Sequence, residues 1–455
     1  MVDRNKVPIS LRIENLPMCG YMRWIAIVVS IAMFAEAVEV NAFGYCMPLV
    51  QAEFAISPEL LGWLSSANNM GMLLGAAITA SLCDWIGRKK VFIICLFTWG
   101  LAGLAFAAST SIEMLFVFRA IFGIGAGAQV PASLALLAEM GPSKNRASFV
   151  VLSLLMVPFA TIGGAGLATL ILSYFTWRTL FVVVSCFALW VFVVIKALPE
   201  SARWLESKNR QEEAAKIVTA YEDRCAKSSG QPVHEFTEEE VVKFEAEIAE
   251  RRRLEAQTKA GFGELWSRQQ IKHTFLGMIW PFCQMLVYFS LTTWLTTLLV
   301  GKGFTVQRST GMIAIFATGG IPAYFAMVWI LNKFGRKVAN IVMALGVGAA
   351  AYVYGMQGAV VTVLICGFIY TFFQFGYNMT YSTYLSELFP TRIRGLGTGF
   401  ASVFGRVGGI SGPVIVGYIM GTGNVNNVFI LIVAVSIVAA CAIFILGTET
   451  KDKLT

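Results

Sequence analysis

The sequence predicts an all-α membrane protein with twelve transmembrane helices in two six-helix bundles. Three observations point to this fold class. Hydrophobic residues make up 57% of the 455 residues and charged residues only 14%, whereas soluble domains carry about 25% charged residues. Twelve segments have the length and composition of membrane-spanning helices. Charged motifs of the first half of the chain also recur, in the same order, in the second half.

The apolar segments form two groups of six on either side of one long polar stretch. A helix needs about 20 mostly apolar residues to cross a bilayer. The first six spans are expected at roughly 22–50, 60–83, 91–109, 112–140, 146–173 and 178–198. The second six are expected at roughly 272–300, 309–333, 337–356, 359–388, 392–420 and 425–447.

The spans divide the chain into five parts. These are an N-terminal segment 1–21, an N-terminal bundle 22–198, a linker 199–271, a C-terminal bundle 272–447 and a tail 448–455. In the linker, Gln211–Ala220 and Glu238–Glu255 are rich in Ala, Glu and Lys, which indicates amphipathic helices. We therefore expect an intracellular helical domain between the bundles.

The distribution of basic residues predicts the orientation. If the N-terminus is cytoplasmic, the loops and termini on that side carry 16 Lys and Arg outside the linker. The loops on the other side carry three, Arg178, Lys302 and Arg308. This asymmetry follows the positive-inside rule. We expect a multi-pass protein of the plasma (inner) membrane with both termini cytoplasmic.

Several other classes of protein are disfavoured. The nine cysteines show no CxxC pair or metal-ligand spacing and most lie in apolar runs, so we expect neither a disulfide framework nor a metal site. The first 22 residues have no apolar core or cleavage site of a signal peptide. The net charge of +8 follows the loop pattern, so no nucleic-acid partner is expected. Nucleotide-binding and hydrolase motifs are missing, which argues against an enzyme and against a cofactor.

Two motifs recur at an offset of 248 residues. Glu139, Pro142 and Arg146 recur as Glu387, Pro390 and Arg394 (387 − 139 = 248). Asp84-Trp-Ile-Gly-Arg-Lys recurs as Asn332-Lys-Phe-Gly-Arg-Lys in the same register. Both motifs lie at helix ends on the expected cytoplasmic side. We expect them to form charge networks that join the halves there and break when that face opens; the alternative is that they only set the topology. The expected gate residues are Asp84, Arg88, Glu139, Arg146, Arg336, Glu387 and Arg394.

Four charged residues are expected well inside the spans. They are Glu36, Glu39, Arg119 and Arg406. Charges at this depth are costly and generally face a cavity or one another, which makes them functional candidates. Glu36 and Glu39 are three residues apart, so they share one side of the first span. We expect at least one of them to carry protons, with Arg119 as a charge partner; the alternative is a buried carboxylate that only orders helix packing.

Arg406 has no counterpart in the first half, because the equivalent position is Pro158 (406 − 248 = 158). An unpaired cation near mid-depth requires an anion. A guanidinium group matches a carboxylate in geometry, so we expect Arg406 to bind an anionic substrate. The alternatives are bonds to helix carbonyls or to a glutamate of the first half.

The seventh and tenth spans combine aromatic and amide side chains. Residues 374, 377, 378 and 381 share one helical face. Such stripes often face lipid or core, but interleaved amides favour a pocket for a flat ring that carries a polar group. The expected binding residues are Trp280, Gln284, Tyr288, Gln374, Tyr377, Asn378 and Tyr381, together with Arg406.

These motifs resemble the major facilitator superfamily over nearly the whole chain. Asp84–Lys90 resembles its loop 2–3 signature, with Ala80 and Trp85 as departures. The segments Arg119–Gly127, Glu139–Arg146, Pro199–Leu205 and Glu387–Gly395 resemble the sugar-porter-like branch, which includes organic ion, synaptic-vesicle-glycoprotein-like and niacin transporters. The resemblance implies two six-helix bundles, an intracellular helical domain and alternating access.

The resemblance also bears on the substrate. Proton-coupled sugar porters carry a glutamine pair in the seventh span, whereas this chain has only Gln284. The segment around Phe34–Glu39 resembles the vesicle-glycoprotein and niacin subgroup, and Arg406 matches an arginine associated with anions in organic anion transporters. In this branch a first-span acid and a fourth-span arginine form the coupling pair, which implies Glu36 with Arg119.

Three functions remain open at this point. The first is proton-coupled uptake of a small organic anion, with nicotinate as the first candidate, by a monomer in the lipid bilayer. The second is a facilitative or proton-coupled carrier of sugars or organic cations, in which Glu36 and Glu39 would bind the cation. The third is a receptor or scaffold that transports nothing, which the short outer loops disfavour.

Overall fold

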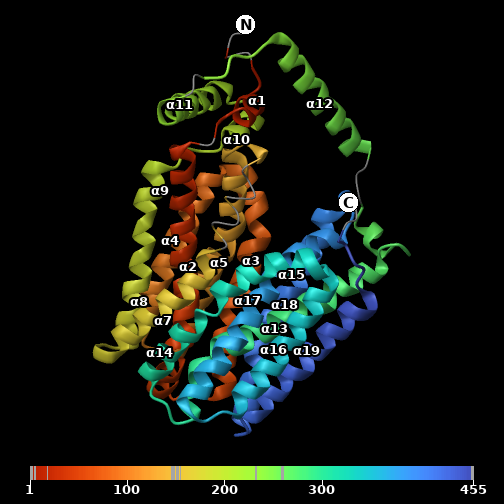
Figure 1. The fold of residues 1–455 in the computed structure, drawn as a ribbon. Helices are drawn as coiled ribbons and strands as arrows, with labels where there is room; N and C mark the ends of the chain where they lie inside the picture. Colours follow the sequence, from red (N-terminus) through yellow and green to blue (C-terminus); the bar gives the residue numbers. More distant parts are fainter. Residues whose placement is uncertain are drawn as a thin grey trace.

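The computed structural model describes residues 4, 7–17, 19–144, 149, 153, 155–230, 233–257 and 261–451. Twelve helical segments in these ranges are long and apolar enough to cross a membrane, as predicted. Six precede the linker and six follow it, and each set packs into one half of the molecule (Figure 1). Both halves are all-helical in the described part of the chain.

The N-terminal half begins with one long helix and ends with a broken one. Its helices are α2 (Gly20–Phe54), α3 (Pro58–Ile86), α4 (Arg88–Ala107), α5 (Ile112–Met140), α7 (Met156–Tyr174), α8 (Trp177–Ser185) and α9 (Val191–Ala197), with the 3₁₀ turn η2 (Cys186–Trp190) between α8 and α9. Ser57 and Ser111 cap α3 and α5 by accepting backbone N–H groups of the first turn. The fifth span was expected from residue 146, but α7 begins at Met156; most of the residues before it lie outside the described ranges.

The C-terminal half repeats this order. Its helices are α13 (Ile271–Gly301), α14 (Val306–Ala317), α15 (Gly320–Phe334), α16 (Arg336–Met356), α17 (Val360–Leu388), α18 (Arg394–Gly421) and α19 (Asn426–Leu446). The eighth span is interrupted between α14 and α15, where Gly320 packs on Phe375; a Cβ atom at Gly320 would lie 2.6 Å from that ring. Gly87 and Gly335 have φ values of 101° and 85° at equivalent turns, which is the left-handed region that favours glycine.

Four helical segments of the linker and an N-terminal helix lie on the side of the molecule where the chain begins and ends (Figure 1). They are α1 (Ile9–Glu14), α10 (Ala202–Ser207), α11 (Gln211–Ser229), α12 (Glu238–Gln257) and the 3₁₀ turn η3 (Phe262–Trp266). The amphipathic helices expected in the linker are therefore present. In Figure 1, α1, α10 and α11 lie against the N-terminal half, and α12 leads across to the C-terminal half.

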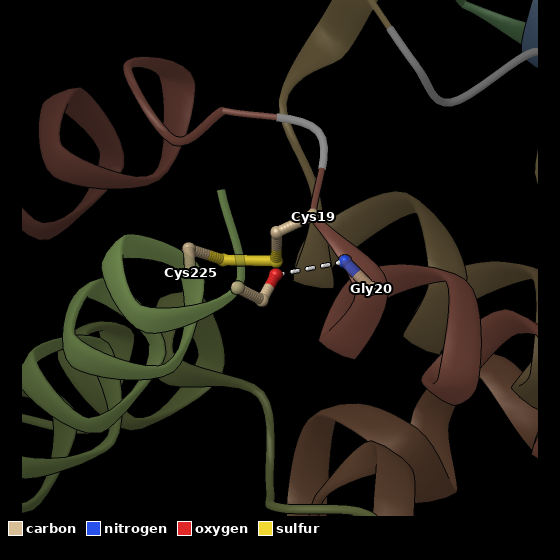
Figure 2. Close-up of a disulfide and its surroundings, with 4 residues drawn as sticks. Cys19, Gly20 and Cys225 are labelled. Carbon is tan, nitrogen blue, oxygen red and sulfur yellow. Dashed lines mark hydrogen bonds between the residues drawn. A yellow bond between two sulfur atoms is a disulfide. The ribbon is translucent and has the colours of Figure 1, made fainter. Parts of the chain in front are cut away.

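One disulfide contradicts the expectation that the cysteines remain unpaired. Cys19, just before α2, is bonded to Cys225 of α11 (Figure 2). The two residues are 206 positions apart, and their Cα atoms come within 5.2 Å because α11 packs against the start of α2. The expectation was wrong because spacing along the chain carries no information about such a distant contact. The other seven cysteines are free.

The two halves meet mainly on the side away from the termini. Helix α3 packs on α18, α7 on α14, and α2 on α13. Ser66 and Asn69 of α3 donate to the carbonyls of Ile410 (2.5 Å) and Gly409 (2.7 Å). Thr169 of α7 is hydrogen-bonded to Thr310 of α14 at 2.9 Å.

Glycines allow the closest approach of the halves. A Cβ atom at Gly62 would lie 2.6 Å from the carbonyl oxygen of Pro413, and one at Gly417 would lie 2.6 Å from that of Pro58. Both pairs occupy the ends of α3 and α18 that are remote from the termini. In a helical membrane protein, small residues at such positions let two backbones pack directly.

Candidate functional site

Glu39 and Arg119 form a charged pair inside the N-terminal half. Arg119 of α5 is 4% exposed, and its guanidinium carbon lies 4.7 Å from the ring centre of Phe43 and 5.2 Å from that of Phe122. Its Nη2 donates to the carbonyl of Val40 at 3.3 Å. Glu39 is fully buried and the two charges attract each other.

The carboxylate of Glu39 is only partly satisfied. Its Oε1 accepts a hydrogen bond from Ser185 of α8 at 2.8 Å. Its Oε2 and the Nε of Arg119 are buried and have no hydrogen-bond partner in the described part of the chain. A buried carboxylate oxygen without a partner is costly when ionised, so a proton on Glu39 would relieve this cost.

Glu36 and Arg406 are a second pair of opposite charges, and they belong to different halves. Glu36 of α2 is 6% exposed and attracts Arg406 of α18 electrostatically. Arg406 also contacts Met72 of α3, with Nη1 at 3.7 Å from the sulfur. The resemblance implied that Arg119 pairs with Glu36. The structure instead places Arg119 near Glu39. It places Arg406 near a glutamate of the first half, which was an alternative to binding an anionic substrate.

Aromatic residues of the C-terminal half surround this second pair. Tyr288 of α13 and Tyr381 of α17 lie near enough to this pair for the charges of Glu36 and Arg406 to act on their hydroxyl groups. The ring of Trp280 lies 5.0 Å from that of Tyr381, and its Nε1 donates to the hydroxyl of Tyr377 at 2.7 Å. Trp280 and Tyr377 are buried and hydrogen-bonded to each other. The position of Trp280 is therefore fixed, and its ring packs against Tyr381.

The expected amide residues occupy different environments. Gln374 is 3% exposed and lines a small cavity of about 40 Å³ next to Tyr288. Gln284 is 1% exposed, and neither its Oε1 nor its Nε2 has a hydrogen-bond partner among the described residues. Asn378 is half-buried. The structure therefore brings Tyr288 and Gln374 to one cavity and places Trp280 and Tyr377 in the core beside it.

The N-terminal gate residues form a cluster within their own half. Arg88 is paired with Glu139 at 2.9 Å and with Asp84 at 3.0 Å. Ser201, after the sixth span, donates to the other oxygen of Glu139. Glu200 accepts the backbone N–H of Lys89 at 2.9 Å and so caps α4.

The C-terminal half contains the matching cluster. Arg336 is paired with Glu387 at 3.2 Å, and Thr450 donates to Glu387 at 2.5 Å. Glu449 accepts the backbone N–H groups of Arg336 (2.8 Å) and Lys337 (3.1 Å), and so caps α16. The roles of Glu200 and Ser201 are thus repeated after the twelfth span.

Sequence reasoning missed the second of these capping motifs. Glu449 and Thr450 follow Glu200 and Ser201 at an offset of 249 residues (449 − 200 = 249), one more than the other motifs. A search that allowed a one-residue insertion would have found them. In this structure each cluster closes within its own half, whereas we expected the networks to join the halves.

One expected gate residue is not part of these clusters, and another is not among the described residues. Arg394, at the start of α18, donates to Thr391 at 3.3 Å rather than to Glu387. Arg146 lies outside the described residues. Sequence reasoning also missed Ser66 and Asn69, whose bonds to α18 hold the halves together; the only sequence signal was a polar run, Ser65–Asn69, inside an apolar span.

Comparison with known proteins identifies the family. A profile of the Major Facilitator Superfamily matches residues 29–384 and 312–455. The chain belongs to the Major Facilitator Superfamily. It is therefore a member of a family of transporters, not of enzymes.

Two relatives cover nearly the whole chain. The chain is 31% identical over 445 residues to the niacin transporter NiaP of Acinetobacter baylyi, covering 97% of each protein. It is 26% identical over 450 residues to the 4-hydroxybenzoate transporter PcaK of the same organism, covering 97% of this chain and 95% of the relative.

The fold is also found among solved structures. The crystal structure of a D-xylose–proton symporter matches with a TM-score of 0.74 at 16% identity, covering 96% of this chain and 100% of the other. The inward-open xylose transporter XylE of E. coli matches with a TM-score of 0.73 at 17% identity, covering 95% and 98%. These similarities show the fold alone.

Proposed function

We propose that this protein imports a small aromatic monocarboxylate together with protons, by alternating access between its two halves, with nicotinate as the first candidate. The observation that carries the proposal is the attraction between Glu36 and Arg406 across the halves. While Glu36 is ionised, it neutralises Arg406. When Glu36 takes up a proton, the guanidinium loses its partner and can bind a carboxylate. Proton and anion would then move together without net charge.

The relatives support the class of substrate. The relatives at 31% and 26% identity are named as transporters of niacin and of 4-hydroxybenzoate, which are both aromatic monocarboxylic acids. A ring fits the surroundings of Arg406, where Tyr288 and Tyr381 interact with the charged pair. Aromatic walls with few polar groups are typical of sites for flat ligands.

The other expected residues take secondary roles in this proposal. Glu39 and Arg119 form a second protonatable pair within the N-terminal half. The clusters around Glu139 and Glu387 brace the ends of their own halves on the side of the termini, which we propose is the cytoplasmic side. The protein would act as a monomer in the plasma membrane, and the linker helices would form an intracellular domain.

Uptake into proteoliposomes tests the role of Arg406. Charge-assisted hydrogen bonds contribute about 1.5–3 kcal/mol each, so Arg406→Ala should raise the KM for nicotinate by roughly tenfold to a hundredfold or more. Arg406→Lys keeps the charge but loses the forked geometry, and should be intermediate. Arg210→Ala, an exposed arginine of the linker, is the matched control and should change nothing.

The same assay decides between substrate classes. Unlabelled nicotinate and benzoate should compete for uptake, whereas xylose and choline should not. Competition by sugars or choline with none by carboxylates would select the alternative function, a carrier of neutral or cationic substrates. An unchanged KM in Arg406→Ala would remove the proposed role of this residue.

A further inference from the structure

Among the described residues, the lining of the cavity beside Tyr288 includes a buried polar group for which the protein supplies no hydrogen-bond partner. The cavity lies between both halves, and its walls are largely apolar or aromatic, including Leu295, Ile313, Phe316 and Phe375. Four hydroxyl groups of the lining already donate to backbone carbonyls; they belong to Tyr45, Thr161, Thr292 and Thr371. Gln374 supplies the amide in this wall, and its Nε2 is buried without a partner among the described residues.

The amide of Gln374 is held in one orientation. Tyr370 lies one turn earlier on α17 and donates its hydroxyl to Oε1 of Gln374 at 3.4 Å. With the oxygen facing Tyr370, the NH₂ group is the end of the amide without a partner among the described residues. Gln374 is only 3% exposed, so bulk water does not compensate this donor. Buried donors in native proteins almost always have partners, and an accepting atom of a bound ligand would supply one here.

The position of the cavity relative to Arg406 suggests which part of a ligand enters it. Tyr288 lines the cavity, and its neighbours Met285 and Phe289 on α13 pack on Gly405 and Gly409, which flank Arg406 on α18. At about 40 Å³ the cavity admits a few atoms rather than a whole aromatic acid. The carboxylate therefore remains on the side of Arg406, and the far edge of the ring points to Gln374.

We infer that Gln374 recognises a hydrogen-bond acceptor on the substrate ring, which makes the transporter selective for pyridine carboxylates over benzoate. This inference rests on the proposed function. A neutral pyridine nitrogen accepts one hydrogen bond and donates none, which matches the free NH₂ of Gln374. Benzoate has the same shape but no acceptor on the ring, so its binding would leave the buried donor unpaired. A binding site that depends on a hydrogen bond discriminates against analogues that cannot form this bond. Such discrimination is far stronger than that of a site that distinguishes ligands by size alone.

Transport of matched acids tests this inference. The ratio of kcat/KM for labelled nicotinate to that for labelled benzoate is measured in proteoliposomes. We expect the wild-type protein to prefer nicotinate by roughly tenfold or more. Gln374→Leu removes the donor at similar size, so nicotinate transport should fall until the ratio approaches one, while benzoate transport is retained. Gln129→Leu, which replaces a buried amide of α5 that does not line this cavity, is the matched control and should keep the wild-type ratio.

Two further measurements test the inference even if Gln374→Leu does not fold. Tyr370→Phe releases the amide of Gln374 and should lower the ratio partway. In the wild-type protein, N-methylated nicotinate has no free lone pair on the ring and should compete no better than benzoate.

The outcomes separate the inference from the function on which it rests. Equal transport of nicotinate and benzoate by the wild-type protein, or equal losses for both acids in Gln374→Leu, would overturn the inference and leave the proposed function intact. A change of the ratio in Gln129→Leu but not in Gln374→Leu would also overturn it. If the wild-type protein transports no aromatic carboxylate at all, the proposed function and the inference fall together.

Discussion

The buried ion pair between Arg12 and Glu222 gives the sharpest prediction about stability. The two side chains are 1% and 3% exposed, and they join α1 to α11. Nε and Nη2 of Arg12 donate to the two carboxylate oxygens at 2.9 and 2.8 Å, and Nη2 also donates to Thr219 at 2.8 Å. This arrangement fixes the N-terminal helix α1 to the linker, and α11 in turn packs against α2 of the N-terminal half.

Arg12→Met should strongly destabilise this contact. It leaves the carboxylate of Glu222 buried without its counter-charge, which costs about 3–5 kcal/mol. The equilibrium constant for local opening of α11 should then increase by roughly two to four orders of magnitude. The double variant Arg12→Met/Glu222→Leu removes both charges and should recover most of the loss, because replacing a whole buried pair by apolar groups is close to neutral.

Hydrogen exchange of the α11 backbone measures this opening directly. The experiment is done under reducing conditions, so that the bond between Cys19 and Cys225 does not hold α11 in place. Arg210→Met is the control, because its pair with Glu213 is exposed and should contribute less than about 1 kcal/mol. The reasoning is refuted if Arg12→Met and Arg210→Met have equal effects, or if the double variant opens as readily as Arg12→Met.

Two further predictions concern the side of the termini. In a digest of the oxidised protein, Cys225→Ser should abolish the cross-linked peptide that contains Cys19. The substitution should also lower the free energy of unfolding of the oxidised protein by about 2–4 kcal/mol, and an unchanged melting temperature would contradict this. Burial alone would raise the pKa of Glu449, but four backbone N–H groups, including those of Arg336 and Lys337, outweigh it and lower the pKa below its usual 4.5. The contribution of ionised Glu449 to the free energy of unfolding is therefore present above about pH 4.5 and is lost as the pH falls further. Glu449→Ala should cost about 1 kcal/mol at pH 7 and nothing in strong acid, as thermal unfolding at several pH values would show; a constant difference across pH would contradict the capping role.

Much of the fold could be predicted because membrane insertion constrains sequence so strongly. A span must be long and apolar, so the twelve segments and their division into six and six are visible directly. The interruption between α14 and α15 could not be predicted from the sequence, because Gly319 and Gly320 lie in an apolar run. Only their packing on α17 reveals the break. The contact between Cys19 and Cys225 likewise depends on tertiary packing alone.

The sequence singled out the deep charged residues, but it did not predict which of them the structure would bring together. Glu36 and Glu39 do lie on one side of α2, yet residues three apart point about 60° away from each other. Glu39 therefore points into the N-terminal half, to Ser185 and Arg119, and Glu36 points to the interface and Arg406. No feature of the sequence determines which acid takes which direction.

The 248-residue repeat predicted that equivalent residues of the two halves have equivalent partners. Arg88 meets Glu139 and Arg336 meets Glu387, as expected for equivalent positions. The capping residues Glu200 and Glu449 were not recognised as a pair because their offset is longer by one residue. Deep charged residues, by contrast, break the repeat, as expected if the two halves have the different roles in proton and substrate binding that we propose.

Proton-coupled transport through Glu36 is the central claim, and the driving force for uptake tests it most directly. Labelled nicotinate is offered to proteoliposomes under an imposed pH gradient, an imposed membrane potential, or neither. The account predicts accumulation driven by the pH gradient, with little effect of the potential because one proton compensates one carboxylate. In Glu36→Gln the pH gradient should no longer drive accumulation, whereas Glu113→Gln, an exposed acid at the start of α5, should behave as the wild-type protein. Uptake that ignores the pH gradient in the wild-type protein, or that follows it unchanged in Glu36→Gln, would contradict the account.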